Sequence, residues 1–425
     1  MMNTNRPSRS AAWIVQIVLI GAVVASWQLG LASPLARLPR QDSARPYRAV
    51  TELPRTRPLV ITPLYDDPAV VSDDELADVL AKIRPVFPAA QLKPNFVEHA
   101  LRAWSVRAKF ADPRALSGEQ LKNFLTDHGR YLASWGEGVA PLLSDQKDGV
   151  EVRWGKEEGA SVHHDHWLAC LTEAGVALDE PVFTASQRPQ TIADVLEQSL
   201  ADFRLDEAEV EWSVMAFGLW IAPQKSWQTR DGRRISFDLL AERLMRGHKR
   251  FGVCSGTHRL YSLMSLVRLD DEFPMLSAER RAEILAHLRS VRDLITVCQF
   301  SDGHWPSNWS SGASALEHPV EDELYKQVIA TGHHLEWLAI APEELHPPRE
   351  QIHKAADWLI ATTRAQSANE ILQRYTFFSH VGNALALWRK THPSEFWSQH
   401  FANRPEPELE LPGESKAVAA EHAGE

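Results

Sequence analysis

Segments with helical periodicity recur along this chain, and they are of two kinds. Some carry charged residues along one face, such as residues 278–299 and 349–363, whereas others are apolar nearly all round, such as residues 209–221 and 377–388. A helix that is apolar on every side is buried in the folded protein. Segments of the buried kind begin near residues 163, 209, 254, 331 and 377.

The spacing between the buried segments limits the possible folds. It is about 45 residues apart from one wide gap, and a repeat of that length corresponds to one helical hairpin. Inner buried helices that alternate with outer amphipathic ones build an α/α toroid or a superhelical solenoid. The chain between the termini has almost no β signal, because no run of alternating β-branched residues is bounded by turn residues. We therefore expect an all-α fold, an α/α toroid of helical hairpins over residues 71–403.

Serine residues mark several of the expected helix starts. Ser72 is followed three residues later by Glu75, and Ser117 is followed by Gln120 at the same spacing. This is the pattern of a capping box, in which the two side chains satisfy each other's backbone amides. Ser277 begins a further helix in a similar way.

The N-terminus carries one uncharged apolar run of about 22 residues, from Ala11 to Ala32, long enough to span a bilayer as a helix. It predicts a transmembrane signal anchor over residues 12–32 after a cytoplasmic tail, residues 1–11. The soluble domain would then be periplasmic or otherwise extracytoplasmic, with the lipid bilayer as a partner. Arginines that follow the span oppose this orientation under the positive-inside rule, and a cleaved signal peptide is the alternative.

Two further segments show no periodicity. Residues 33–70 are rich in Pro and Arg, which is typical of a linker. Residues 404–425 are polar and acidic, which predicts a disordered tail.

Composition excludes one class of function and leaves another open. The formal net charge of -11 argues against general nucleic-acid binding, which needs a concentrated basic face. The 15 Trp residues fit either core packing between long helices or an aromatic pocket for a sugar or an apolar ligand. The three cysteines show neither a redox spacing nor a disulfide framework.

Polar residues that could carry chemistry cluster near the starts of the buried segments. In a toroid these helix ends meet at one mouth, so the groups would share a site, flanked by tryptophans. A polar group on an apolar helix is costly unless it is paired or faces a wet pocket. The expected members are His163, His164, His166, Glu211, Cys254, His258, His333, His334, Glu336 and His380.

One turn resembles a known family. The sequence QFSDGHW, residues 299–305, resembles the Q-x-x-D-G-x-W motif of squalene cyclases and related terpenoid-cyclase and prenyltransferase toroids. In that family the motif tightens a turn between helices, so the resemblance implies a structural role. It predicts that Gly303 adopts a backbone conformation that other residues resist.

Two more segments resemble toroidal enzymes. Residues 331–340 are similar to the G-H-x-x-E segment of N-acylglucosamine 2-epimerases, (α/α)6 barrels, which implies that His333 is an acid/base catalyst with Glu336 beside it. The sequence GVCSG, residues 252–256, is similar to a zinc-binding corner of lanthionine-synthetase-like toroids, which implies that Cys254 and His333 are ligands. That family's second cysteine falls at Gly332.

These residues support three hypotheses. The first is an enzyme that acts on a carbohydrate or similar small molecule, as an isomerase or epimerase, a hydrolase or a lyase. The second is a zinc-dependent toroid enzyme. The third is a non-catalytic binding or scaffold protein at the cell envelope, whose inner polar groups only satisfy one another. In the first, His333 and His380 are the acid and base. The catalytic candidates are His333, His380, Glu336 and Glu211, the ligand-binding candidates are His163, His166, Trp212 and Trp337, and the metal candidates are Cys254, His258 and His333.

Each candidate also has an ordinary explanation. Cys254 could be a small core hydrophobe, which is what a free cysteine usually is. His380 could be a hydrogen-bonded core residue. Glu211 could form an ion pair with an arginine such as Arg259.

Overall fold

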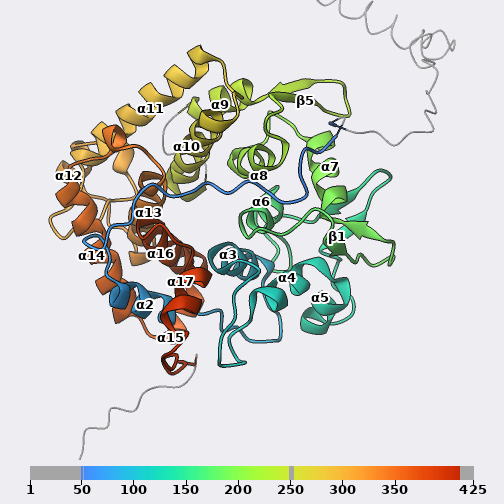
Figure 1. The fold of residues 1–425 in the computed structure, drawn as a ribbon, viewed down its shortest axis with the longest axis horizontal. Coiled ribbons are helices and arrows are strands. Elements are labelled where there is room, and N and C mark those ends of the chain that lie inside the picture. Colours follow the sequence, from blue (N-terminus) through green and yellow to red (C-terminus); the bar gives the residue numbers. More distant parts are fainter. Residues whose placement is uncertain (1–48, 51, 248–252, 412–425) are drawn as a thin grey trace, which may run out of the picture. The chain divides into compact units, whose positions relative to one another are not determined.

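The computed structural model describes residues 49–50, 52–247 and 253–411, which belong to one compact unit, residues 47–425. Among these residues, no helix is both long and apolar enough to cross a membrane. The expected cytoplasmic tail and membrane anchor, residues 1–32, lie outside them. The described part of the chain is mostly helical, as the periodicity predicts (Figure 1).

Six helices contact one another in a closed order, each packing against the next and the last against the first. Figure 1 shows them around the middle of the unit. They are helices of the buried kind; in α8, for example, every residue is buried. The six are α3 (Pro94–Trp104), α6 (His166–Glu173), α8 (Glu211–Ile221), α10 (Thr257–Glu272), α13 (Leu324–Ala339) and α16 (Tyr375–Trp388).

A second set of helices packs outside this ring. They are amphipathic, and α11 buries only four of its 19 residues. These helices alternate with the ring helices along the chain, so each ring helix is followed or preceded by an outer one. The outer set is α2 (Asp73–Lys82), α4 (Gly118–Thr126), α7 (Ile192–Asp202), α9 (Phe237–Met245), α11 (Ala278–Thr296) and α14 (Arg349–Ala365).

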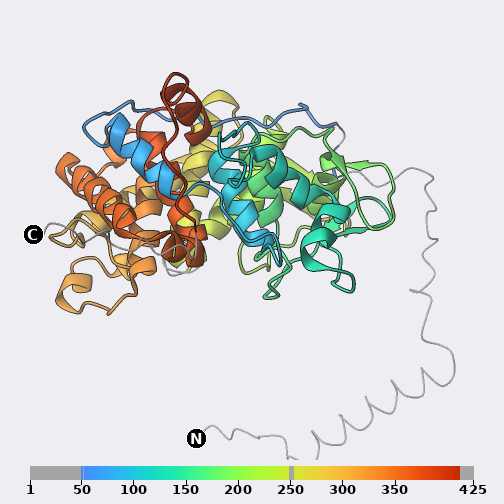
Figure 2. The same ribbon diagram turned by 90° about the horizontal axis from the view of Figure 1, so that it is seen from below.

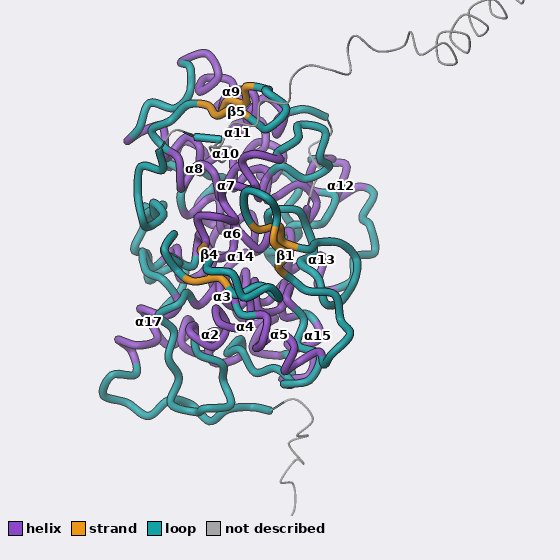
Figure 3. Tube along the Cα trace, turned by 90° about the vertical axis from the view of Figure 1, so that its right-hand side faces the viewer, coloured by secondary structure: helices purple, strands orange, loops and turns teal. Residues whose placement is uncertain are grey.

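Shorter elements fill the connections. The short helices are α5 (His128–Trp135), α12 (Ser314–Glu317), α15 (Ala368–Gln373) and α17 (Pro393–His400), with 3-10 turns η2 (Val253–Gly256), η3 (Trp309–Ser311) and η4 (Glu343–Leu345). The strands, a small part of the fold (Figure 3), form three antiparallel hairpins. They pair β1 (Leu143–Asp145) with β2 (Val150–Val152), β3 (Pro181–Val182) with β4 (Gln190–Thr191), and β5 (Ser226–Gln228) with β6 (Arg234–Ser236). Runs this short leave no alternating pattern in the sequence.

The predicted helix caps are confirmed at the positions that the sequence indicates. Ser72 and Glu75 form a capping box at the start of α2, and Ser117 and Gln120 form one at the start of α4. The Ser277 side chain accepts a hydrogen bond from the backbone of Arg280 at the start of α11.

The segment before α2 is not a free linker over its described part. The amides of Leu59, Leu64 and Asp67 donate to the carbonyls of Leu219, Ala339 and Trp388, which lie in the last turns of α8, α13 and α16. Those carbonyls have no partner within their own helices. Figures 1 and 2 both show this segment running across one face of the unit. It therefore caps the carboxyl ends of the ring helices.

The start of the expected disordered tail is also packed. Leu409 is buried, Arg84 donates to the carbonyl of Glu408 (2.8 Å), and Lys82 pairs with Glu410 (2.9 Å). The prediction of disorder from residue 404 onward is therefore wrong for residues up to 411, because basic side chains near the end of α2 bind this acidic stretch. The remaining residues lie outside the described part.

The turn at residues 299–305 is confirmed as a structural device. Gly303 has φ +110°, and a Cβ there would lie 2.2 Å from the carbonyl oxygen of Lys354. The Gln299 side chain donates to the carbonyls of Gly303 (2.8 Å) and Gln351 (2.7 Å), which ties the turn to α14.

Gly303→Ala is expected to lower the free energy of unfolding by about 3 kcal/mol, because it adds both backbone strain and a collision with the Lys354 carbonyl. Gly136→Ala is the matched control, since Gly136 has φ +81° but nothing within 4 Å of an added Cβ. Urea unfolding of the two variants separates the collision from the strain. Equal losses would show that the contact with α14 does not constrain the turn.

Candidate functional site

Side chains from four of the ring helices meet inside the ring. They are Arg102 from α3, His258 from α10, His333 and Glu336 from α13, and His380 and Asn383 from α16, with Cys254 from η2 beside them. All but Cys254 are buried. Neighbouring helices of this set contact one another around the ring, so residues up to 278 positions apart become neighbours.

The backbone before α10 delivers the Cys254 thiol. Cys254 (φ 51°) and Ser255 (φ 58°) both adopt left-handed conformations, and Gly256 (φ 81°) follows. Such conformations are uncommon in residues other than glycine and concentrate at functional sites. The hydroxyl of Thr257 donates to the Cys254 carbonyl at 2.7 Å and closes the turn. The thiol therefore lies within 4.8 Å of a ring nitrogen of His258, the second residue of the helix.

Cys254, His258 and His333 form a group with the composition of a metal site. Their ligand atoms all lie within 4.8 Å of one another, and the Nε2 atoms of His258 and His333 are 2.9 Å apart. Zinc bonds of about 2.0–2.3 Å in a tetrahedral site place two nitrogens about 3.3 Å apart and sulfur about 3.6 Å from nitrogen. The present spacing needs only small side-chain movements to match.

His333, Glu336 and His380 form a second group within 4.8 Å, but it is a weaker metal candidate. Glu336 is already engaged, because it accepts from Asn383 (2.8 Å) and Arg102 (3.2 Å) and lies 3.1 Å from Nδ1 of His380. The guanidinium would also repel a cation. Glu336 lies 3.7 Å from Nδ1 of His333, on the side of that ring opposite Nε2. That is the place of a carboxylate that orients a metal-bound histidine.

The protonation states suit metal binding better than a thiolate nucleophile. Burial, reinforced by His333, His380 and Arg102, holds the pKa of His258 well below its usual value, and burial does the same for His333 and His380. These imidazoles are therefore neutral. Burial and then the charge of Glu336 raise the pKa of Cys254. A reactive cysteine needs a lowered pKa, whereas a coordinated metal deprotonates a thiol outright.

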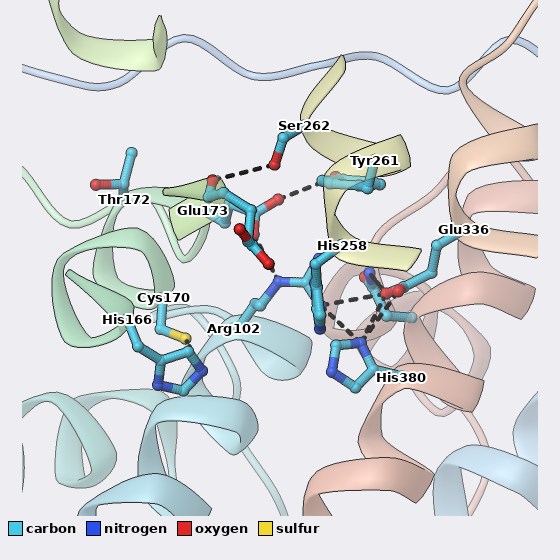
Figure 4. A network of polar contacts seen from close by, with 12 residues as sticks. Arg102, His166, Cys170, Thr172, Glu173, His258, Tyr261, Ser262, Glu336 and His380 are labelled. Atoms are coloured by element: carbon cyan, nitrogen blue, oxygen red, sulfur yellow. Dashed lines mark hydrogen bonds and ion pairs between the residues drawn. The ribbon is translucent and has the colours of Figure 1, made fainter. Parts of the chain in front are cut away.

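Arg102 connects the two sides of the ring. Its Nε donates to Glu173 of α6 at 2.5 Å, while its Nη1 lies 3.2 Å from Glu336 and 2.9 Å from Nδ1 of His380. Figure 4 shows it between these partners, with the Tyr261 hydroxyl bonded to Glu173 at 2.9 Å. Arg102 thereby fixes Glu336 and, through it, His380.

A second polar group lies beside the first. His166 bonds Glu98 through Nδ1, and its Nε2 is 3.5 Å from the Cys170 sulfur. The Trp212 ring lies between His166 (4.4 Å between centroids) and His258 (4.3 Å), so the two groups adjoin. Burial raises the pKa of Glu98 to about 8. All of these side chains are buried, so the group is a connected part of the interior.

The structure thus brings together four of the candidates that the sequence places on different hairpins, namely Cys254, His258, His333 and His380, with Glu336. His166 and Trp212 adjoin them. Their aromatic side chains pack against one another, and all but Cys254 are buried. The group is therefore joined by direct contacts and not by an open central cavity.

Three candidates lie elsewhere. Glu211 lines an outer cavity of about 410 Å³ with Arg243 and Arg259; burial lowers the pKa of Arg259, and the charge of Glu211 only partly opposes this. Trp337 donates to His334 at 3.0 Å, about 100° around α13 from Glu336. His163 pairs with Glu209 nearer the surface. Trp337 is therefore corrected as a site residue, since its indole bonds His334, whereas the charge of Glu211 still acts on Cys254 from outside the group.

Sequence reasoning missed the contribution of α3. Its segment NFVEHALRAW reads as amphipathic, yet nine of its 11 residues are buried, including Glu98, His99 and Arg102. These three polar residues fall within about 100° of one another and form an ordinary polar face, so the sequence carries no signal that this face is buried. Glu173, Tyr261 and Asn383 were also missed.

Comparisons with known proteins do not relate this site to one already described. No family model, curated protein or solved structure matches the chain.

Proposed function

We propose that the ring and its outer helices form an α/α toroid, and that the protein is a metal-dependent enzyme with a zinc ion held by Cys254, His258 and His333. The closed order of contacts among the six ring helices supports the toroid. The observation that carries the metal site is the meeting of two imidazole Nε2 atoms at 2.9 Å with a thiol beside them. Membrane attachment and an extracytoplasmic location remain predictions from the sequence.

The ligand set favours zinc over harder cations. Sulfur and imidazole nitrogen are the donors that zinc prefers, while magnesium and calcium select oxygen. Three protein ligands leave a fourth position for water or substrate, which is the pattern of catalytic rather than structural zinc. Zinc in such a position activates water or polarises a carbonyl.

His380 is placed to accept a proton beside the metal. Its Nδ1 faces Glu336, and its Nε2 is buried with no hydrogen-bond partner among the described residues. Its ring centroid is 4.0 Å from that of His333. Nδ1 lies 2.9 Å from the Arg102 donor and 3.1 Å from the Glu336 acceptor, and in the tautomer whose Nδ1–H donates to Glu336, Nε2 carries the lone pair. The reaction class is therefore hydrolysis, or addition of a nucleophile, with His380 as the base.

The other two hypotheses fit the interior less well. An acid/base pair that works on a bound sugar would face it across a gap, whereas the rings of His333 and His380 are in contact. A scaffold would satisfy its inner polar groups, yet Nδ1 of His333, Nε2 of His380 and Nη2 of Arg102 are buried without hydrogen-bond partners in the described part of the chain. Such atoms in a native interior call for an explanation, often a bound ion or water.

Elemental analysis of the full-length protein, purified in detergent, is expected to find about one equivalent of zinc per chain. Cys254→Ser, His258→Gln and His333→Gln should each weaken zinc binding by more than about 100-fold, since each removes a direct ligand. Cys298→Ser is the control, because Cys298 is buried outside the group and bonds only the Ile295 carbonyl. Undiminished zinc in all three ligand variants would exclude the site.

Thiol labelling gives an independent readout. Cys170 and Cys298 are fully buried and Cys254 is partly exposed, so iodoacetamide should modify Cys254 before the other two in the chelated, folded protein, and slowly, because burial and Glu336 raise the pKa of its thiol. Added zinc should slow this labelling at least tenfold. Peptide mass spectrometry identifies the modified residue, and equal rates with and without zinc would contradict coordination by this sulfur.

A further inference from the structure

His163 and His164, which the metal site does not use, lie at a partly exposed polar rim, whereas the neighbouring Asp165 and His166 are buried. His163 pairs with Glu209, and Nδ1 of His164 lies 2.8 Å from Glu207 and 3.4 Å from Asp165. The side chains of His163 and His164 are 24% exposed, and that of Glu209 is 27% exposed. Two histidine–carboxylate pairs therefore stand next to each other; the paired atoms of His164 and Glu207 are buried, but parts of both histidine rings reach solvent.

An exposed tryptophan adjoins this rim. Trp154 is 52% exposed, and its ring meets the edge of His164 at 5.4 Å between centroids. Its backbone is well ordered, because Trp154 bridges Ser161 and the amide of Gly155 donates to the Ser161 carbonyl at 2.9 Å. A large apolar ring held in this way at the surface is a typical contact for a ligand.

The rim leads toward the centre of the ring. The His163 ring lies nearly parallel to that of Trp212, with 6.0 Å between centroids and 19° between planes. Trp212 in turn contacts His258 at 4.3 Å. One side chain thus separates the rim from a proposed metal ligand.

The chemistry of the rim selects among ligand classes. An apolar ligand would bury the carboxylates without partners, and an anion would face Glu207, Glu209 and Asp165. A cation would meet His164: burial lowers its pKa, but Asp165 and Glu207 outweigh this and raise the pKa to about 11, so His164 is charged. A neutral polyhydroxylated ligand can donate to the carboxylates, accept from the histidines and stack on an indole.

We propose that Trp154, His163, His164, Glu207 and Glu209 bind a neutral carbohydrate. Trp154 provides the stacking surface, and the two histidine–carboxylate pairs bind hydroxyl groups. This binding is independent of the metal. Only the further step, delivery of the sugar past Trp212 to the metal, rests on the proposed function.

Saturation-transfer NMR on the full-length protein tests the proposal with four probes, namely cellohexaose, maltohexaose, xylohexaose and chitohexaose, each at millimolar concentration. At least one is expected to bind, and equally with or without chelator. Trp154→Ala should weaken that binding at least tenfold, and Trp154→Phe less. Phe183→Ala is the matched control, since Phe183 is a 43% exposed aromatic outside the rim.

Several results would overturn this assignment. One is that none of the four sugars binds, and another is that Trp154→Ala binds them like the unchanged protein while circular dichroism shows it folded. A third is that tetramethylammonium binds at Trp154 while the sugars do not, which would make the rim a cation site. Sugar binding by Cys254→Ser at the affinity of the unchanged protein would support the rim whether or not the metal proposal holds.

Discussion

Acidification from neutral pH to about pH 4 is expected to unfold the protein cooperatively. Burial holds the pKa values of five histidines well below their ordinary value near 6.5, and it lowers that of His334 to about 3. The other five are His99, His166, His258, His333 and His380. In each case, below pH 6.5, the unfolded chain binds a proton at a pH where the same histidine in the folded protein stays neutral.

The sign and size follow from proton linkage. Above pH 6.5 both states are neutral at these sites, so the contribution to stability is complete. As pH falls from 6.5 toward the folded pKa values, each histidine removes about 1.4 kcal/mol per pH unit. Six such groups exceed a typical stability of about 5–15 kcal/mol within roughly two units. Glu98, with its pKa raised to about 8, opposes this, but it is a single group.

Far-UV circular dichroism across the acid range measures the effect. His334→Gln should shift the midpoint to lower pH, because it removes one of the buried groups, whereas His318→Gln, at an exposed position, should leave it unchanged. A chelated sample should still unfold cooperatively on acidification, at a pH somewhat above that of the zinc-loaded protein, because bound zinc stabilises the folded state. Full native signal at pH 4 would show that these imidazoles are accessible to protons in the folded state.

A feature of this interior could be predicted from the sequence where the residues that form it lie close together in the chain. The capping boxes at Ser72 and Ser117 and the turn at Gly303 could be predicted because each involves residues a few positions apart. The burial of α8 and α16 could be predicted equally well, since a helix that is apolar on all sides is buried. The all-helical character follows from these elements.

The partners of the polar residues could not be predicted in this way. Arg102 bonds residues 71, 234 and 278 positions away, and nothing in its own helix indicates this. The segment before α2 lacks periodicity because its backbone bonds helix ends and not a neighbouring strand. Composition alone therefore gives the same prediction for a packed strap and for a linker.

Helix phase explains the error at Trp337. At about 100° per residue, Glu336 lies about 60° to one side of His333, while Trp337 lies about 40° and His334 about 100° to the other. The boundary between the two faces of α13 falls close to Trp337, and its long indole reaches His334. The spacing of polar and apolar residues in the sequence does not show on which side of this boundary the Trp337 side chain lies.

Arg102→Met is expected to lower the free energy of unfolding by about 3–5 kcal/mol, the usual cost of removing one partner of a buried ion pair. Arg102 is 4% exposed and Glu336 is 1% exposed, so water cannot replace the lost cation. Burial lowers the pKa of Arg102, but Glu173 and then Glu336 more than offset this and raise it. The carboxylate of Glu336 would be left buried with only Asn383 and His380 as partners.

Arg107→Met is the matched control on the same side of the fold, because its pair with Glu395 is exposed and worth at most about 1 kcal/mol. The double variant Arg102→Met/Glu336→Gln should recover part of the loss, since it removes the stranded charge together with its partner. Urea unfolding gives the three values. If Arg102→Met costs no more than Arg107→Met, the guanidinium does not hold Glu336. If it costs more but the double variant recovers nothing, the loss lies with Glu173, and the orientation of His380 must come from Asn383 and the packing of α13 against α16.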